Sequence, residues 1–268
     1  MDGSGDIFAE MGDVWADATK SIVINGKVSD LYYEPYDDGD DVPLQDIYLD
    51  GDMTQEDTIY DIDSDAARKI CKWLQKKSLD APLRITYCDV KTEDLQLIPR
   101  YVYRLILTGN AIEVYDTFLY KLVVLNLSLN PLRSIDVLPI GLKELNVAHT
   151  LLEKLPRLPM GLERLNISNT RIKSLYGLPQ CLKKLVMNEC GVRVIKNGVL
   201  PNGLEHLECA SCELEKIPST IPDTVRYLNV AWNNIRHVKR WPDALLYLDI
   251  RMNPYDRAVP AYVRDIFR

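Results

Sequence analysis

The sequence predicts an α/β solenoid, a curved coil of short turns whose strands form one parallel sheet on the concave side, opposite an extended convex side. Three observations support this fold class. A period of about 20 residues runs from residue 102 to residue 253, apolar residues recur at fixed places within each period, and prolines separate many of the periods. An amphipathic segment ahead of the first period adds a helical N-terminal cap to the prediction.

The repeating unit reads L-x-x-L-x-L-x-x-N-x-L and occurs eight times in succession. Its fourth position is leucine in every unit, from Leu105 to Leu248. Positions four and six are both apolar, which is the spacing of a strand with one buried face. Each unit is expected to supply one strand and to bury its leucines by stacking on its neighbours. The first position falls, at steps of 20 to 22 residues, on Val102, Leu122, Leu142, Leu162, Leu182, Leu204, Val225 and Leu245.

The segment 155–179, LPRLPMGLERLNISNTRIKSLYGLP, contains the unit together with an L-P-x-x-L entry. Across residues 101–253 this pattern resembles the short leucine-rich repeats of bacterial secreted effectors of the YopM and IpaH type. The resemblance implies a leucine-rich repeat solenoid that binds another protein. In the IpaH type a ubiquitin-ligase domain follows the repeats, but only fifteen residues follow Asn253 here, so we expect no enzymatic activity. Residues 79–90 resemble a degenerate opening repeat, with Leu83 and Ile85 at positions four and six.

The spacing Cys209-x-x-Cys212 raises the question of a zinc site or a thioredoxin-like redox pair. In the repeat register Cys209 occupies apolar position six, and Cys212 occupies position nine, where buried backbone groups need a short polar partner. We therefore expect both to be structural, and we expect no metal and no other cofactor. Cys190 should be the ladder neighbour of Cys212, within reach of a disulfide, although reduced thiols are the expectation. Position nine reads Asn110, Asn130, Thr150, Thr170, Cys190, Cys212, Asn233 and Asn253.

Charge is divided unevenly along the chain. Residues 1–65 hold 19 of the 39 acidic residues but only two of the 32 basic ones, a net charge of −17, whereas the remaining residues carry +10. Such an acidic segment either docks on the basic body or repels the body from nucleic acid. We therefore expect no nucleic-acid partner, and self-association through the acidic arm is an alternative use of the same charge.

Four regions follow from these patterns. Residues 1–63 form an acidic N-terminal arm, with a predicted helix near its start and a hairpin at Asn25-Gly26. Residues 64–100 combine a capping helix over 64–77 with the degenerate first repeat, residues 101–253 hold the eight repeats, and residues 254–268 form a C-terminal cap. In this last cap a short helix is expected to begin near Pro260 and to seal the final unit with four side chains. These are Tyr262, Val263, Ile266 and Phe267.

Motifs for catalysis or ion binding are weak. The three histidines, His149, His206 and His237, fall in different units, so the register predicts no shared metal and no catalytic triad. The acidic stretch 33–65 approaches a calcium-loop spacing, but Gln55 stands where that loop requires glycine, and a solvated loop is expected. No leader peptide and no apolar run of about 18 residues occur, which predicts a soluble cytoplasmic protein, in a host cytoplasm or nucleus if the origin is a pathogen, without a membrane partner.

On the predicted concave face, positions three, five and eight of each unit point outward, and the candidate binding residues are those of positions three and eight in the later units, with Arg251 beside them. Exposed tryptophan, tyrosine, methionine and arginine are enriched at protein interfaces because they supply a large contact area. The C-terminal tail could instead fold back over them. The predicted partner-binding residues are Tyr227, Trp232, Tyr247, Arg251, Met252, His206, Arg164 and Lys184.

The sequence therefore predicts a non-enzymatic, intracellular scaffold for protein–protein interaction. By family analogy it would be a pathogen-encoded effector that binds a host protein. The alternative is a structural subunit of a larger assembly such as a virion, with the acidic arm ordered against a neighbouring copy.

Overall fold

The computed structural model describes residues 22–24, 27–29, 66, 69, 70, 73, 81–255, 257–263 and 265–267. The chain divides into two compact units, Met1–Ser78 and Leu79–Arg268. Among the described residues, no helix is long and apolar enough to cross a membrane.

In the first unit, strands β1 (Ile22–Ile24) and β2 (Lys27–Ser29) pair antiparallel. Ile24 is opposite Lys27, so two residues connect the strands, as the Asn25-Gly26 signal predicts. Further along, Ala66, Lys69, Ile70 and Trp73 are helical. Ala66, Ile70 and Trp73 are buried, which agrees with the predicted apolar face, while the role of this helix as a cap of the repeats stays a prediction. The predicted helix near the start and the acidic stretch 33–65 lie outside the described residues.

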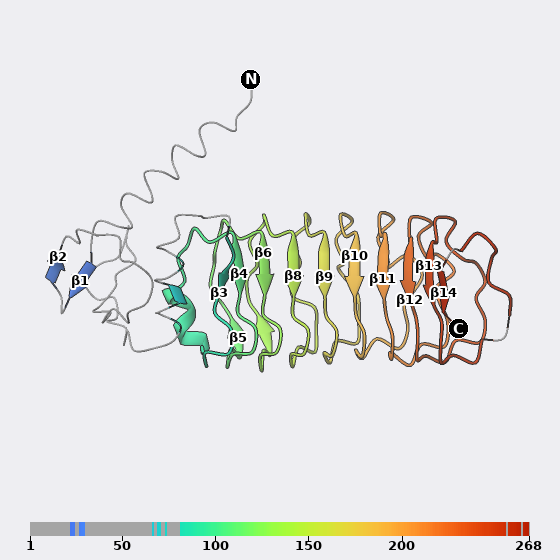
Figure 1. Cartoon of the computed structure of the whole chain (residues 1–268), viewed down its shortest axis with the longest axis horizontal. Coiled ribbons are helices and arrows are strands. Elements are labelled where there is room, and N and C mark those ends of the chain that lie inside the picture. The colour runs from blue at the N-terminus through green and yellow to red at the C-terminus, as the bar shows by residue number, and fades with distance from the viewer. Residues whose placement is uncertain are drawn as a thin grey trace, which may run out of the picture. The chain divides into compact units, whose positions relative to one another are not determined.

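The second unit contains one ten-stranded sheet in which neighbouring strands are parallel (Figure 1). Strand β3 (Leu83–Arg84) comes from the predicted degenerate repeat and pairs with β4 (Arg104–Ile106) through Leu83 and Leu105. Each of the eight predicted units then supplies one strand, in chain order along the sheet. After β4 these are β6 (Val124–Asn126), β8 (Glu144–Asn146), β9 (Arg164–Asn166), β10 (Lys184–Val186), β11 (His206–Glu208), β12 (Tyr227–Asn229) and β13 (Tyr247–Asp249).

Smaller elements lie between the strands of the early turns. A 3-10 helix, η1 (Thr92–Leu97), follows β3, and it buries Leu95. Strands β5 (Val114–Tyr115) and β7 (Ser134–Ile135) form a separate two-stranded parallel sheet. The later turns return mostly without regular secondary structure, and their prolines cannot donate to a sheet.

The leucine columns form the core. Leu105, Leu125, Leu165 and Leu248 are at most 1% exposed. No leucine at the fourth position of a unit is more than 2% exposed. The strands pair leucine to leucine, for example Leu125 with Leu145, so each turn covers the apolar side of the next. The predicted register is confirmed in all eight units.

Position nine satisfies the buried backbone at each turn. The side chain of Asn130 accepts from the backbone N–H of Ile112 at 3.1 Å and donates to the carbonyls of Leu107 and Leu127 at 2.8 and 2.9 Å. Thr150 makes a single bond of this kind, to Val147 at 2.8 Å. The predicted structural role of this column is confirmed, because the side chains complete hydrogen bonds that water cannot reach.

The Cys-x-x-Cys motif is part of the same core. Cys209 is 1% exposed at position six, as predicted, and Cys212 is 1% exposed at position nine. The Cys212 thiol donates to the Met187 carbonyl at 3.0 Å, which is the role that asparagine has in other turns. Among the described residues no group of three or more metal-binding side chains comes together.

Position eight adopts a left-handed backbone in every unit. Leu129, Trp232 and Met252 have φ of 58°, 57° and 57°, and Gly109 has φ of 71°. Left-handed residues other than glycine are unfavourable by about 1–2 kcal/mol each. This conformation turns the chain inward after the strand, and it explains why no β-branched residue occupies the column.

The C-terminal segment forms a strand rather than the predicted helix. Strand β14 (Asp265–Phe267) pairs parallel with β13, with Ile266 opposite Leu248. A turn precedes it in which the Val263 N–H bonds the Pro260 carbonyl at 3.2 Å, and the same turn joins Leu245 to Pro242 at 3.3 Å. The segment therefore copies the proline-containing entry of a repeat, because the open edge of β13 offers backbone hydrogen bonds that a helix would leave unused.

Candidate protein-binding surface

Three rings form a continuous stack on the outer face of the sheet, the face opposite the core. Position three places His206, Tyr227 and Tyr247 side by side on β11, β12 and β13. The ring centroids of His206 and Tyr227 are 4.1 Å apart, as are those of Tyr227 and Tyr247, with 4° between the planes in both pairs. Parallel strands lie about 4.8 Å apart, so in-register rings need only a small tilt to reach contact distance.

The surroundings of Tyr227 in the stack keep its phenol protonated. Burial raises the pKa of the Tyr227 phenol well above its ordinary value, and the hydrogen bond with Tyr247 and the carboxylates of Glu208 and Asp249 raise it further. Tyr227 is therefore neutral at physiological pH, so it offers a flat, uncharged surface with a hydroxyl at its end.

Two carboxylates at position five, those of Glu208 and Asp249, contact the basic side chains in and beside the stack. One oxygen of Glu208 lies 2.5 Å from His206 Nε2 and 3.8 Å from Lys184 Nζ. The other accepts from the Asn188 amide at 3.2 Å. The hydrogen bond with His206 is the main cause that lowers the pKa of Glu208, and the bond from Asn188 lowers it too, against desolvation. Glu208 is thus ionised, and its contacts join the fifth and sixth turns.

Asp249 forms the second charged pair with Arg251. The guanidinium makes two bonds to the carboxylate, Nε to Oδ1 at 3.0 Å and Nη2 to Oδ2 at 2.7 Å. Asp249 is only 3% exposed, whereas the arginine side chain is half exposed. The two-point contact fixes the direction of Arg251 and raises its pKa.

Trp232 and Met252 project from the rim of this face. Each is 61% exposed, and each stands at left-handed position eight of its unit. The C-terminal strand therefore does not cover them, in contrast to the tail arrangement that the sequence left open. Together, His206, Tyr227, Tyr247, Trp232, Arg251 and Met252 are named here the aromatic surface.

The remaining two predicted residues lie further along the sheet. Arg164 on β9 pairs with Glu144, and Lys184 on β10 pairs with Glu208. Arg164 is four strands from Tyr247, about 19 Å at normal strand spacing. Sequence reasoning did not single out Glu208 and Asp249, because position five is mostly polar throughout the repeats. The available signal was that Glu208 stands two residues from His206, and Asp249 two residues from Arg251.

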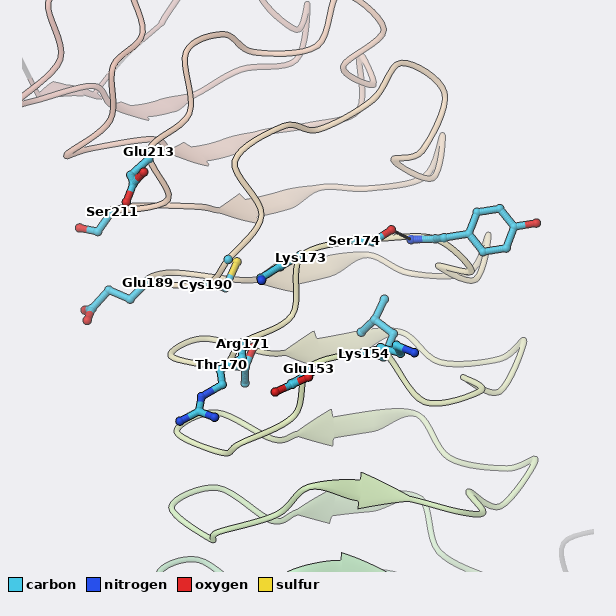
Figure 2. Close-up of a pocket in the computed structure, with 13 residues that line it drawn as sticks. Glu153, Lys154, Thr170, Arg171, Lys173, Ser174, Glu189, Cys190, Ser211 and Glu213 are labelled. Atoms are coloured by element: carbon cyan, nitrogen blue, oxygen red, sulfur yellow. Dashed lines mark hydrogen bonds between the residues drawn. The ribbon is translucent and has the colours of Figure 1, made fainter.

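Two open grooves lie along the turns that follow the strands. The larger, of about 1060 Å³, crosses the third to sixth units and has Glu153, Arg171, Lys173, Cys190 and Gly191 in its lining (Figure 2). The smaller, of about 450 Å³, runs beside Leu151 and Lys154. Acids and bases alternate in the larger groove, so it has no dominant charge.

The repeat length, the parallel ladder and the buried polar column together decide the fold family. The second unit is a leucine-rich repeat solenoid. Among solved structures, it is similar to YopM from Yersinia enterocolitica, with 27% sequence identity and a TM-score of 0.50 over 62% of this chain and 41% of that one. It is also similar to YopM, a leucine-rich effector protein from Yersinia pestis, with 26% identity and a TM-score of 0.57 over 63% of this chain and 48% of that one.

A third similar structure is a Shigella effector leucine-rich repeat domain, with 23% identity and a TM-score of 0.50. It covers 71% of this chain and 76% of that domain, and it shows the fold alone. This chain spans less than half the length of either YopM structure, 41% and 48%. No protein-family model matches the sequence, and no curated protein matches it.

Proposed function

We propose that this leucine-rich repeat protein is a non-enzymatic scaffold that binds another protein through the aromatic surface. The observation that carries the proposal is the His206–Tyr227–Tyr247 stack, with exposed Trp232 and Met252 at its side. Tryptophan and tyrosine contribute a disproportionate share of binding energy at protein interfaces.

The arrangement is also preorganised. The rings hold one another, and Arg251 is held by Asp249 through two bonds. Side chains that are already ordered lose less conformational entropy when a partner binds, which improves affinity without added contacts. Only Trp232 and Met252 would still have to be immobilised, at roughly 0.5–1.5 kcal/mol each.

The partner that we propose is a host protein, and the place of action is inside a host cell. Support comes from the similarity to YopM, which is described as a leucine-rich effector protein. An effector of this kind needs a rigid, extended surface rather than a catalytic pocket, and the repeats offer one.

A photo-crosslinking amino acid at position 232 tests the proposal directly. We expect a covalent adduct with one host protein from a variant that carries the crosslinker in place of Trp232. A matched variant with the crosslinker at Tyr176, which is 89% exposed on a different part of the solenoid, should give no such adduct. The combined substitution Trp232→Ala with Tyr247→Ala should abolish capture of that partner while circular dichroism stays unchanged.

Two outcomes would contradict the proposal. Equal adducts from positions 232 and 176 would mean that contact is unspecific, and capture that survives the double substitution would place the contact elsewhere. Light scattering after size-exclusion chromatography separates the alternative, because a defined multimer without a host partner would indicate a structural assembly subunit.

A further inference from the structure

Cys190 and Cys212 are a close pair of free thiols in the ninth-position column. Their sulfur atoms are 3.8 Å apart. They follow the paired residues Lys184 and His206 by six residues each, so they occupy equivalent points of two adjacent turns. The pair therefore joins the fifth and sixth units at the level where other turns use asparagine or threonine.

The usual spacing of adjacent parallel turns is compatible with a disulfide. Adjacent parallel turns lie about 4.8 Å apart, and disulfides bridge Cα atoms that are about 4.4–6.8 Å apart. The sulfurs would have to approach to about 2.05 Å, which rotation of the two side chains can supply. The bond from the Cys212 thiol to the Met187 carbonyl at 3.0 Å would be lost in that step.

A path for a small oxidant reaches the pair. Cys190 is in the lining of the larger groove, together with Gly191 (Figure 2). A Cβ atom at Gly191 would lie only 3.0 Å from the Ile172 carbonyl oxygen, so this position next to Cys190 carries no side chain for a steric reason. Cys190 is 7% exposed and Cys212 is 1% exposed, so Cys190 is the member of the pair that faces the groove.

The neighbouring cysteines are placed differently. Cys209 is 1% exposed at position six, inside the core, and burial raises its pKa well above the ordinary value. Cys181 is exposed, and it is not in the lining of this groove. The contact between the paired sulfurs lowers the pKa of Cys212 and, together with burial, raises that of Cys190. Thiolate character is therefore favoured at Cys212 over Cys209.

We propose that Cys190 and Cys212 are a reversible oxidation site, where peroxide converts two thiols into one disulfide between adjacent repeats. One thiolate attacks peroxide, the O–O bond breaks, and a sulfenic acid and hydroxide form. The second sulfur attacks the sulfenic sulfur, the S–O bond breaks, and the hydroxyl group leaves as water. Two thiols and one peroxide thus give a disulfide and two waters, and a dithiol reductant reverses the change.

Mass spectrometry of the full chain tests this site. The folded protein is treated with a small excess of hydrogen peroxide, unfolded with an alkylating reagent, and digested with trypsin. We expect a linked pair of peptides, residues 185–193 with residues 197–216, which accounts for the thiols of Cys190 and Cys212. Dithiothreitol before alkylation should return both thiols.

Three variants assign the bond. Trypsin leaves Cys209 and Cys212 in one peptide, so Cys209→Val, which copies position six of other units, should keep the linked peptides. Cys190→Thr and Cys212→Asn, which copy position nine of other units, should each abolish them. If the folded wild-type protein gives no linked peptides at a peroxide dose that oxidises exposed Cys181, the proposal is wrong. It is equally wrong if Cys209→Val abolishes the link.

Discussion

Tyr227 and Tyr247 stack with their ring centroids 4.1 Å apart and their planes within 4° of parallel. The stack follows directly from the pairing of β12 with β13, in which the two tyrosines are opposite each other. The tyrosine stack of the aromatic surface therefore depends on the strand pairing of the solenoid. Substitutions in the stack should affect stability as well as partner capture.

Tyr227→Ala should lower stability by roughly 2 kcal/mol, because it removes the middle of the stack and both of its ring contacts, each worth about 0.5–1.5 kcal/mol. Urea unfolding followed by circular dichroism measures the change. Tyr176→Ala is the matched control, since that ring is 89% exposed and should change stability by less than about 0.5 kcal/mol. Equal effects of the two substitutions would mean that the stack does not stabilise the fold.

Asn130→Ala should be more harmful than Thr150→Ala, although both stand at position nine. Asn130 bonds one backbone N–H and three carbonyls, whereas Thr150 bonds a single carbonyl. Buried groups left without a partner are unfavourable by about 1–3 kcal/mol each, so we expect a loss of about 3 kcal/mol against about 1 kcal/mol. Urea midpoints of the two variants decide the order, and the reverse order would contradict this account of the column.

Trp232→Asn should stabilise the protein while it weakens partner capture. Trp232 adopts φ of 57°, a conformation that asparagine tolerates better than tryptophan does. We expect a gain of up to about 1 kcal/mol, which thermal unfolding can measure. Because Trp232 is 61% exposed, the loss of its contacts in the free protein should be small. A clear loss of stability would show that the ring packs on the solenoid more than its exposure indicates.

Glu208 should make stability depend on pH in the acidic range. Its pKa is lowered in the folded protein, mainly by the bond with His206. A carboxylate of this kind stabilises the fold fully above its unfolded pKa of about 4.3 and ceases to do so as the pH falls through the lower folded value. The difference in urea midpoint between wild type and Glu208→Gln should therefore be largest near neutral pH and should shrink below about pH 4. A difference that is the same at both pH values would contradict the pairing.

The core and the polar column were predictable because each depends on a single period. One leucine every 20 to 22 residues, as from Leu105 to Leu125, leaves no other way to share one buried side, and the short side chain at Cys212 must then face the backbone. The opening turn at Leu83 could be predicted for the same reason, despite its incomplete motif.

The C-terminal segment shows where this reasoning stops. Tyr262, Val263, Ile266 and Phe267 have a spacing that suits the apolar face of a helix, yet Pro260, Val263 and Ile266 also repeat the entry of a leucine-rich unit. Local propensity does not separate the two readings. The free edge of β13 does, because it supplies partners for the backbone of β14.

The sequence by itself determined the turn length, the strand register and the inward direction of each leucine and each ninth-position side chain, since all of these follow from one period repeated along the chain. Only the tertiary structure decided that Glu208 joins His206 to Asn188, that Asp249 holds Arg251, and that the sulfurs of Cys190 and Cys212 lie within 3.8 Å. These contacts depend on side-chain rotamers, and two of them join residues from different turns. A period does not specify which way a side chain rotates.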